Sequence, residues 1–310
     1  MATPEKQSQR TLGQALLAAL CYFDLFRYPL TVEELRRYRF GGPAAMPTVA
    51  ETEAALATLP IDRRDGFCCL AGRAANITER QRRYRLAEPK FRLARRFVRA
   101  LALLPSVRLV AVCNSLAMSN AHEESDIDLF VVVRPGTIWM TRLIAAGALA
   151  VLGLRPDEVT GADRLCLSFL VTEEALDLSR VAIRPTDPYL NYWLATLVPL
   201  YDAGGVFDQF IEANAWASEL LPGFVTPQAG HRRSLPRRPA APVSLFMRWL
   251  EPLARRVQYK LFPQAIRDQA NLSSDVLVSD HILKFHVRDD RRRIAEDFAK
   301  KCGEMGLDGI

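Results

Sequence analysis

Apolar residues recur at helical spacing near the start of the chain, where the pattern over residues 12–23 predicts an amphipathic helix. Tyr28-Pro29 is expected to end that helix, because the residue before a proline avoids the α region. Two more helices are expected after Thr31 and Thr48, since each has a glutamate three residues later and can form a capping box. The pattern therefore predicts three short helices within the first 60 residues.

A hairpin is expected next, with Asp65-Gly66 as its turn. Three helices followed by a hairpin are the order of a winged helix, so we assign residues 1–72 to a winged-helix-like module. Such modules bind DNA or serve as packing and protein-contact units. The third helix, residues 48–59, would be the recognition helix, but it carries Glu51 and Glu53 and no Lys or Arg. Because an acidic helix suits a phosphate-lined groove poorly, this composition favours the structural role.

A basic amphipathic helix is predicted to connect this module to the rest of the chain over residues 73–105, with Pro89 as a candidate kink. The cationic residues of this segment are Arg73, Arg80, Arg82, Arg83, Arg85, Lys90, Arg92, Arg95, Arg96 and Arg99. One interpretation is a solvated face, which is usual for a charge run. The other is an electrostatic lip for a nucleotide or an RNA.

Residues 106–225 alternate between buried strands and helices. Strands are predicted at residues 107–113, 126–133 and 165–171, and helices at 138–154, 191–200 and 206–221. Thr137 is the expected cap of the first of these helices. Arg142 lies within it among apolar residues, so it needs an anionic partner, which is either a nucleotide phosphate or a core carboxylate. The alternation indicates an α+β fold with a small mixed sheet and flanking helices.

The last part, residues 226–310, is predicted to be a basic linker followed by helices. Arg and Pro dominate residues 230–242, which is typical of a linker. Residues 245–262 form a basic amphipathic helix whose apolar side contains Phe246, Trp249, Leu250, Leu253, Val257 and Leu261. That side is expected to dock onto the main body, with a membrane-surface helix as the alternative. A last helix is expected over 290–305, and His286 is interpreted as structural.

Composition adds a cellular context. The formal net charge of +6 is concentrated in the two basic stretches, which favours polyanionic partners such as nucleic acid or nucleotide phosphates. The six cysteines form no zinc pattern with the four histidines and are typical of a reducing compartment. The longest apolar stretch, residues 138–154, is short for a membrane span and contains Arg142. With no signal-peptide pattern at the N-terminus, a cytoplasmic protein without a transmembrane segment is expected.

The chemistry is concentrated between the first two strands of the central region. Asp126 and Asp128 project from one face of a strand, because side chains alternate along it. Two close carboxylates repel each other unless a cation lies between them, and Mg²⁺ prefers a few carboxylates together with substrate phosphates. The preceding strand ends in Asn114-Ser115, where a turn would present a hydroxyl and backbone N–H groups to a phosphate.

This arrangement resembles the signature of DNA-polymerase-β-like nucleotidyltransferases, which have a strand, a Gly-Ser turn, a short helix and a strand with Asp-x-Asp. The motif covers residues 107–171, and residues 22–31 and 283–286 add a similarity to bacterial proteins that join a winged-helix-like N-terminus to this domain. The resemblance implies transfer of a nucleoside monophosphate from a nucleoside triphosphate to a hydroxyl of a protein, RNA or small molecule. It implies one or two Mg²⁺ ions at Asp126 and Asp128, and nucleotide contacts from Asn114, Ser115 and Ser119. Arg142 is a further candidate for nucleotide contact if its anionic partner is a phosphate.

Two departures from the family pattern bear on activity. Asn114 and Ser119 stand where the family has glycine, although Asn is the best non-glycine residue for the left-handed region. The third strand contains no acid, and only Asp163, Glu173 and Glu174 flank it, so no general base is assigned. A nucleotide-binding protein without catalysis is therefore the main alternative, and a winged-helix DNA-binding regulator is another.

Overall fold

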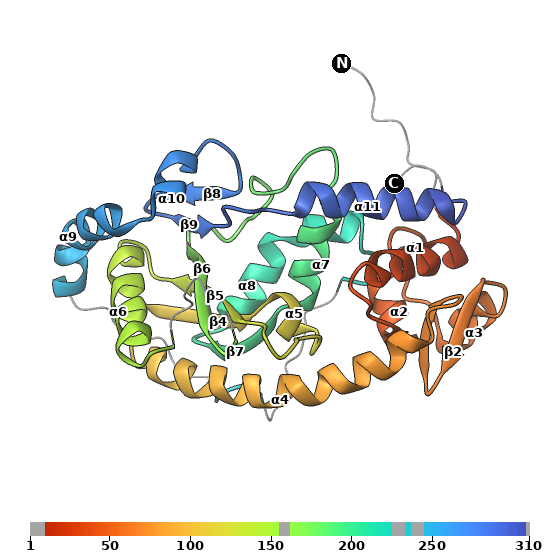
Figure 1. Cartoon of the computed structure of the whole chain (residues 1–310). Coiled ribbons are helices and arrows are strands. Elements are labelled where there is room, and N and C mark those ends of the chain that lie inside the picture. The colour runs from red at the N-terminus through yellow and green to blue at the C-terminus, as the bar shows by residue number, and fades with distance from the viewer. Residues whose placement is uncertain (1–9, 155–161, 225–232, 237–244, 308–310) are drawn as a thin grey trace, which may run out of the picture.

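The computed structural model describes residues 10–154, 162–224, 233–236 and 245–307. Within these ranges the chain is an α+β protein with eleven α-helices and two β-sheets (Figure 1). The predicted α+β class is confirmed, while most of the expected linker at 230–242 lies outside the described residues. Among the described helices, none is both long and apolar enough to cross a lipid bilayer.

The N-terminal module consists of three helices and a three-stranded sheet of order β1-β3-β2. Its elements are α1 (Leu12–Asp24), β1 (Leu30–Thr31), α2 (Val32–Tyr38), α3 (Val49–Leu56), β2 (Ile61–Arg64) and β3 (Phe67–Leu70). Both predicted capping boxes are present, because Thr31 accepts a hydrogen bond from the N–H of Glu34 and Thr48 from that of Glu51. The element order expected for this region is therefore confirmed.

A 27-residue helix, α4 (Ala75–Leu101), leads from this module along one side of the molecule (Figure 1). Its predicted apolar stripe is buried, and Pro89 lies within the helix without ending it. Some of its basic residues form ion pairs within the protein, such as Arg80 with Glu34 and Lys90 with Asp163. Others are exposed to solvent on this helix: Arg82, Arg85, Arg92, Arg96 and Arg99.

A six-stranded sheet of order β7-β4-β5-β6-β9-β8 forms the centre of the molecule. Its strands are β4 (Val107–Val112), β5 (Ile127–Val133), β6 (Leu165–Thr172), β7 (Val198–Asp202), β8 (Val276–Val278) and β9 (Ile282–Phe285). Strands β5 and β6 are parallel, and the other neighbouring pairs are antiparallel. The three predicted central strands are confirmed, and they form the middle of this mixed sheet.

Two sequence predictions about the edges of this sheet were wrong. Helix α7 spans Pro188–Thr196, and residues 198–202 form strand β7 rather than the end of a helix. Pro199 explains the change, because it restricts Val198 to extended conformations and cannot donate the hydrogen bond that a helix interior needs. The C-terminal region is also not purely helical, since β8 and β9 extend the sheet beyond β6.

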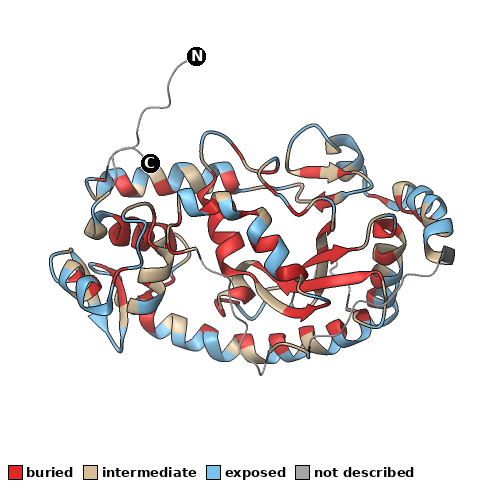
Figure 2. Cartoon of the chain, turned by 180° about the vertical axis from the view of Figure 1, so that it is seen from behind, coloured by how far each residue is buried: buried red, intermediate tan, exposed pale blue. Residues whose placement is uncertain are grey.

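Helices cover both faces of the central sheet, so its strands are buried on both sides (Figure 2). On one face Val110, Leu129 and Val131 share a core with α4 and α6 (Ile138–Val151). On the other face Leu109, Phe130 and Val132 share a core with α7 and α8 (Val206–Ala213). Alternate residues of β4 and β5 thus serve opposite layers. A short 3-10 helix at Ala215–Glu219 follows α8.

The N-terminal module and the C-terminal helix α11 (Arg291–Glu304) are joined through a shared apolar core. Tyr22 of α1 stacks on Tyr192 of α7 with ring centroids 4.1 Å apart, and Phe298 of α11 meets Tyr22 edge-on. Aromatic pairs of this kind add to the stability gained from burial alone. Helices α1, α7 and α11 are therefore packed together.

Helix α6 is capped differently from the prediction. Thr137 occupies the N-cap position, but its hydroxyl donates to the carbonyl of Arg134 and does not cap the helix. The free N–H groups of Trp139 and Met140 instead donate to the carboxylate of Glu251, at 2.7 and 2.9 Å. A carboxylate at a helix N-terminus also interacts favourably with the helix dipole. Glu251 belongs to α9 (Leu245–Leu261), which is followed by α10 (Gln264–Gln269).

Candidate active site

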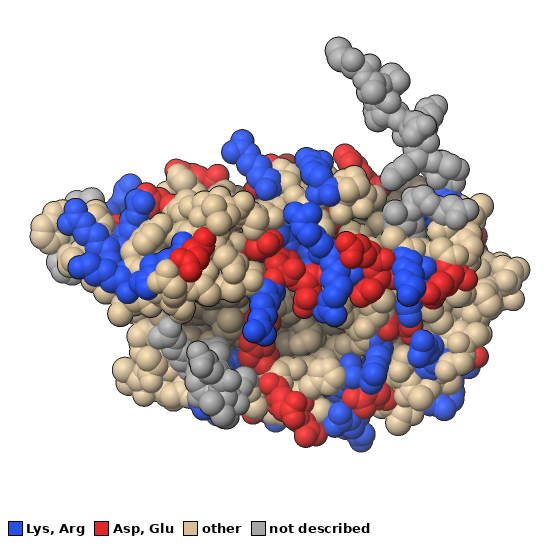
Figure 3. Space-filling view, turned by 45° about the horizontal axis from the view of Figure 1, so that its top comes forward, with Lys and Arg blue, Asp and Glu red and all other residues tan. Residues whose placement is uncertain are grey.

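Asp126 and Asp128 lie on one wall of a cavity of about 740 Å³. Asp126 directly precedes β5 and Asp128 is its second residue, so the alternation along the strand directs both side chains to the same space. Both residues are half-buried rather than in bulk solvent. Figure 3 shows a hollow on one face of the molecule, with acidic and basic side chains mixed along its border. Their shared position in this cavity agrees with the expectation that both side chains project from one face of the strand.

The electrostatics of this pair are unfavourable without a counter-charge. Burial and the neighbouring charge of Asp126 raise the pKa of Asp128 to about 6, and hydrogen bonds from Asn114 and Cys166 oppose that rise. Burial also raises the pKa of Asp126, against the effects of its own backbone N–H and of the Lys90 charge. Because a cation between the carboxylates would relieve both effects, these residues fit a divalent metal ion.

The turn that follows β4 has the backbone conformation expected from the motif. Asn114 and Ser119 both have φ of 55°, which lies in the left-handed region. These are the two positions at which the resemblance expects glycine, and asparagine tolerates this region better than other non-glycine residues. Between them, α5 (Asn114–Ala117) forms a single helical turn. The prediction that Asn114 preserves the turn is therefore confirmed.

The side chain of Asn114 is tied directly to the acid pair. Its Nδ2 donates to Oδ2 of Asp128 at 2.7 Å, and its Oδ1 accepts a hydrogen bond from the hydroxyl of Tyr189 at 3.0 Å. One carboxylate oxygen of Asp128 is thus already engaged by the protein. A glycine at position 114 would leave that oxygen without this hydrogen bond.

Ser115 lies in a second, neighbouring cavity of about 480 Å³. Both cavities are lined by Leu25, Phe26, Asn114, Tyr189 and Trp193. Asn114 lines both cavities and precedes Ser115 in the chain, so it connects the serine-bearing turn to the acid pair. Leu25 and Phe26 follow helix α1, so the N-terminal module supplies part of the wall of both cavities.

Ser119 and Arg142 make contacts within the protein. The Ser119 hydroxyl accepts a hydrogen bond from Arg233 at 3.2 Å and is nearly buried. Arg142 donates to Oε1 of Gln258 and lies over the ring of Phe285, 4.5 Å from its centroid. Neither residue lines the cavity that contains the two aspartates. Ser119 shapes the turn, and Arg142 joins α6 to α9 and β9, so the geometry gives no support to direct nucleotide contacts from either.

The three acids considered for the third carboxylate position point elsewhere. Asp163 forms an ion pair with Lys90 at 2.8 Å, Glu173 with Arg108 at 3.1 Å, and Glu174 contacts His281 at 3.4 Å. None of them lines the cavity. We therefore assign none of these carboxylates to the site.

Cys166 occupies the position beside Asp128 on the neighbouring parallel strand β6. One ligand atom each from Asp126, Asp128 and Cys166 lies within 4.8 Å of the others, and no other such group of three was found in the described residues. Burial and the charge of Asp128 raise the pKa of the Cys166 thiol to about 12, so it is protonated at neutral pH. Sequence reasoning missed this residue, because only the strand register brings it beside the acids.

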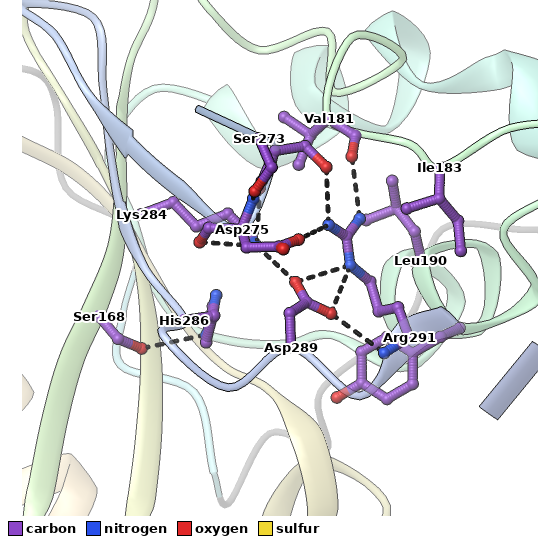
Figure 4. A network of polar contacts seen from close by, with 12 residues as sticks. Ser168, Val181, Ile183, Leu190, Ser273, Asp275, Lys284, His286, Asp289 and Arg291 are labelled. Carbon is purple, nitrogen blue, oxygen red and sulfur yellow. Dashed lines mark hydrogen bonds and ion pairs between the residues drawn. The ribbon is translucent and has the colours of Figure 1, made fainter. Parts of the chain in front are cut away.

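A network around Arg291 holds another part of the cavity lining (Figure 4). Its guanidinium contacts both oxygens of Asp289, at 2.8 and 2.9 Å, and Oδ2 of Asp187 at 3.0 Å. Lys284 also donates a hydrogen bond to Asp289. Burial alone would raise the pKa of the Asp289 carboxyl, but the hydrogen bonds and charges of Arg291 and Lys284 outweigh it and hold that pKa well below its usual range. Because α11, β9 and the N-terminus of α7 are linked here, the network fixes the C-terminal segment against the cavity.

His286 follows β9 and faces the same space, with Nε2 3.4 Å from the hydroxyl of Ser168 on β6. Burial and the nearby charge of Lys284 lower its pKa to about 4, so the ring is neutral at pH 7. Its contact with Ser168 and its edge-on contact with Phe169 agree with the structural role expected from the sequence.

Comparison with known proteins adds no relative from which a function can be transferred. The search of protein-family models gave no match, and the searches of curated proteins and of solved structures gave none either. The functional argument therefore rests on the site itself.

Proposed function

We propose that this chain is a metal-dependent nucleotidyltransferase with a polymerase-β-like core and a winged-helix-like N-terminal module. The observation that carries the proposal is the position of Asp126 and Asp128, half-buried in one cavity beside a turn with left-handed backbone at Asn114 and Ser119. The mixed sheet, in which β4 and β5 flank this turn, is in keeping with the motif.

In this reaction a hydroxyl oxygen of the acceptor attacks the α-phosphorus of a nucleoside triphosphate. The bond from that phosphorus to the bridging oxygen breaks, and pyrophosphate leaves. Asp126 and Asp128 would hold Mg²⁺, which neutralises phosphate charge and orients the reacting oxygens. Ser115 would contact the phosphate tail from the adjoining cavity, and Asn114 shapes the turn between them. The proton of the attacking hydroxyl would pass to solvent water in the cavity.

A second candidate, a nucleotide-binding or regulatory protein without turnover, is favoured by two specific observations. The hydrogen bond from Asn114 engages one oxygen of Asp128, and a thiol rather than a carboxylate stands beside the pair on β6. Both features reduce the number of free oxygen ligands for Mg²⁺, which prefers oxygen. ATP·Mg²⁺ binding measured by calorimetry, without transfer in the assay below, would identify this alternative.

The acceptor is a protein, an RNA or a small molecule, and one feature of the fold favours RNA. Arg85, Arg92, Arg96 and Arg99 are exposed along α4, which is a strip of positive charge about 21 Å long at 1.5 Å per residue. Strips of this kind attract the phosphate backbone of nucleic acids. Association with RNA through α4 is therefore part of the proposal.

The direct test is transfer of label from each α-³²P-labelled nucleoside triphosphate to components of a cell extract, with Mg²⁺ or with EDTA. We expect label on one class of acceptor with the native chain, and loss of at least a hundredfold with Asp126→Asn or Asp128→Asn. Asp65→Asn is the matched control, since Asp65 is an exposed residue in the β2–β3 turn. Absence of metal-dependent transfer from all nucleotides would exclude the catalytic proposal.

A further inference from the structure

Helix α9 docks onto the body of the protein through its polar side. Glu251 caps α6, and Gln258 donates to the carbonyl of Trp139 at 2.6 Å while accepting a hydrogen bond from Arg142. Ala254 and Gln258 are almost fully buried at this contact. The sequence prediction that the apolar side of this helix docks was therefore wrong. The reason is that specific hydrogen bonds to the end of α6 decide which side faces inward.

The apolar side of α9 consequently faces solvent. Four large side chains at intervals of four residues are exposed: Trp249 by 75 %, Leu253 by 56 %, Val257 by 38 % and Leu261 by 70 %. They form one line of about 18 Å along the helix, because each residue rises 1.5 Å. Leu250 is half-buried, and the side chain of Phe246 lies outside the described part of the structure. An apolar line of this length on a helix indicates an interaction surface.

The charged side chains that α9 itself exposes are all positive. Arg248, Arg256 and Lys260 are exposed on α9, and Arg255 is paired with Asp280. The helix contains one acid, Glu251, and that acid is turned inward to cap α6. On the outward surface of α9, exposed tryptophan and aliphatic residues therefore alternate with cations.

The combination of exposed apolar residues and cations on α9 distinguishes two possible partners, a second copy of this chain and an anionic lipid bilayer. In a two-fold contact between copies of this chain, Arg248, Arg256 and Lys260 would be brought near the same residues of the second copy, and like charges would repel. An anionic bilayer offers both complements at once, namely an apolar interior and a negatively charged surface. Tryptophan is also characteristic of the headgroup region.

We propose that α9 is an interfacial helix that binds the surface of anionic lipid bilayers through Trp249, Leu253, Val257 and Leu261. The helix lies in the plane of the headgroups, with its apolar line inserted and Arg248, Arg256 and Lys260 close to lipid phosphates. This binding does not depend on the nucleotidyltransferase proposal, since neither the acids nor their cavity takes part in it.

The test is co-sedimentation of the full chain with vesicles of phosphatidylcholine alone or mixed with phosphatidylglycerol. We expect binding to the mixed vesicles that weakens with salt, and little binding to phosphatidylcholine. The double variant Trp249→Ser/Leu253→Ser should lower the partition coefficient at least tenfold, and Arg256→Glu/Lys260→Glu should lower it on mixed vesicles. Leu103→Ser is the matched control, because Leu103 is an exposed leucine (72 %) outside α9.

Tryptophan fluorescence gives an independent measurement, because it does not depend on how much protein is recovered with the sedimented vesicles. Trp139 and Trp193 are buried and Trp216 is half-buried, so Trp249 is the indole whose environment changes most on binding. Anionic vesicles should shift the emission to shorter wavelength, and Trp249→Phe should abolish that shift. Failure of the native chain to bind mixed vesicles would overturn the proposal. So would unchanged binding of the double variant, or a dimer in light scattering that the double variant dissociates.

Discussion

Replacement of Asn114 by glycine should change stability and metal affinity in opposite directions. The substitution removes the hydrogen bond from Nδ2 to Oδ2 of Asp128, which is 2.7 Å long. Hydrogen bonds to charged groups contribute about 1.5–3 kcal/mol to stability, so the metal-free protein loses an amount of this order. Because φ at position 114 is 55°, glycine recovers part of that loss by relieving backbone strain of about 1 kcal/mol. We expect a net destabilisation of about 0.5–2 kcal/mol without metal.

The same change should strengthen binding of Mg²⁺. In the native chain the Asn114 amide takes one of the two lone pairs of Oδ2 of Asp128, so a metal that approaches along that lone pair displaces the hydrogen bond. In the variant both lone pairs are available. If the displaced bond contributes about 1.5–3 kcal/mol, the dissociation constant for Mg²⁺ should fall by roughly 10- to 100-fold. Urea unfolding in EDTA measures the loss of stability without metal, and calorimetric titration with Mg²⁺ measures the gain in metal affinity.

Asn114→Ala separates the two contributions. It removes the same hydrogen bond, but alanine is disfavoured at positive φ by about 1–2 kcal/mol, so it should be less stable than the glycine variant and bind Mg²⁺ equally well. Tyr189→Phe removes only the hydroxyl that holds Oδ1 of Asn114 and should give a smaller gain in affinity. Equal or weaker Mg²⁺ affinity in both position-114 variants would refute the reasoning, because the hydrogen bond would then not compete with the metal.

Three further predictions follow from the site and from α4. Cys166→Asp places a third carboxylate beside Asp128, so it should raise the affinity for Mg²⁺. It should also increase nucleotide transfer tenfold or more in the labelled-nucleotide assay, and lower activity in a folded variant would contradict this prediction. The pKa of Asp128, about 6, exceeds the value near 3.9 of an unfolded aspartate, so the metal-free folded state binds more protons between these values. Stability from this group is thus fully present below about pH 4 and lost as pH rises through 6, by up to about 3 kcal/mol, and Mg²⁺ should bind more weakly as pH falls through 6. Urea unfolding in EDTA should show this loss of unfolding free energy with rising pH in the native chain and not in Asp128→Asn. Equal pH profiles of the two proteins would contradict the assignment of the effect to Asp128. The triple variant Arg92→Ser/Arg96→Ser/Arg99→Ser should weaken RNA binding and reduce its salt dependence in a filter assay. Arg292→Ser should not, because Arg292 is an exposed arginine of α11 that does not line the cavity of the acid pair. Unchanged binding of the triple variant would remove α4 from the proposal.

Features of this protein that depend on local sequence were predictable. The capping boxes at Thr31 and Thr48, the hairpin turn at Asp65-Gly66 and the left-handed turn at Asn114 are each determined by a few neighbouring residues. The side-by-side position of Asp126 and Asp128 follows from the alternation along one strand. These local rules were sufficient to locate the acid pair.

Features that depend on distant pairing were not predictable. Cys166 lies beside Asp128 only because of the register of two parallel strands, and that register cannot be derived from the sequence of either strand alone. Arg291 contacts Asp187, 104 residues earlier in the chain, and an ion pair over such a separation leaves no periodic signal. For α9 the apolar side of the helix was predicted correctly, but hydrogen bonds to α6 turn that side toward solvent.

The central claim is that Asp126 and Asp128 hold a metal ion beside a bound nucleotide. The most direct measurement is anomalous diffraction from crystals soaked with Mn²⁺ and a non-hydrolysable nucleoside triphosphate. We predict an anomalous peak about 2.0–2.3 Å from an oxygen of each aspartate, bridged to phosphate oxygens that approach the turn at Ser115. Ordered nucleotide with no peak between the aspartates, or a metal bound elsewhere, would contradict the account.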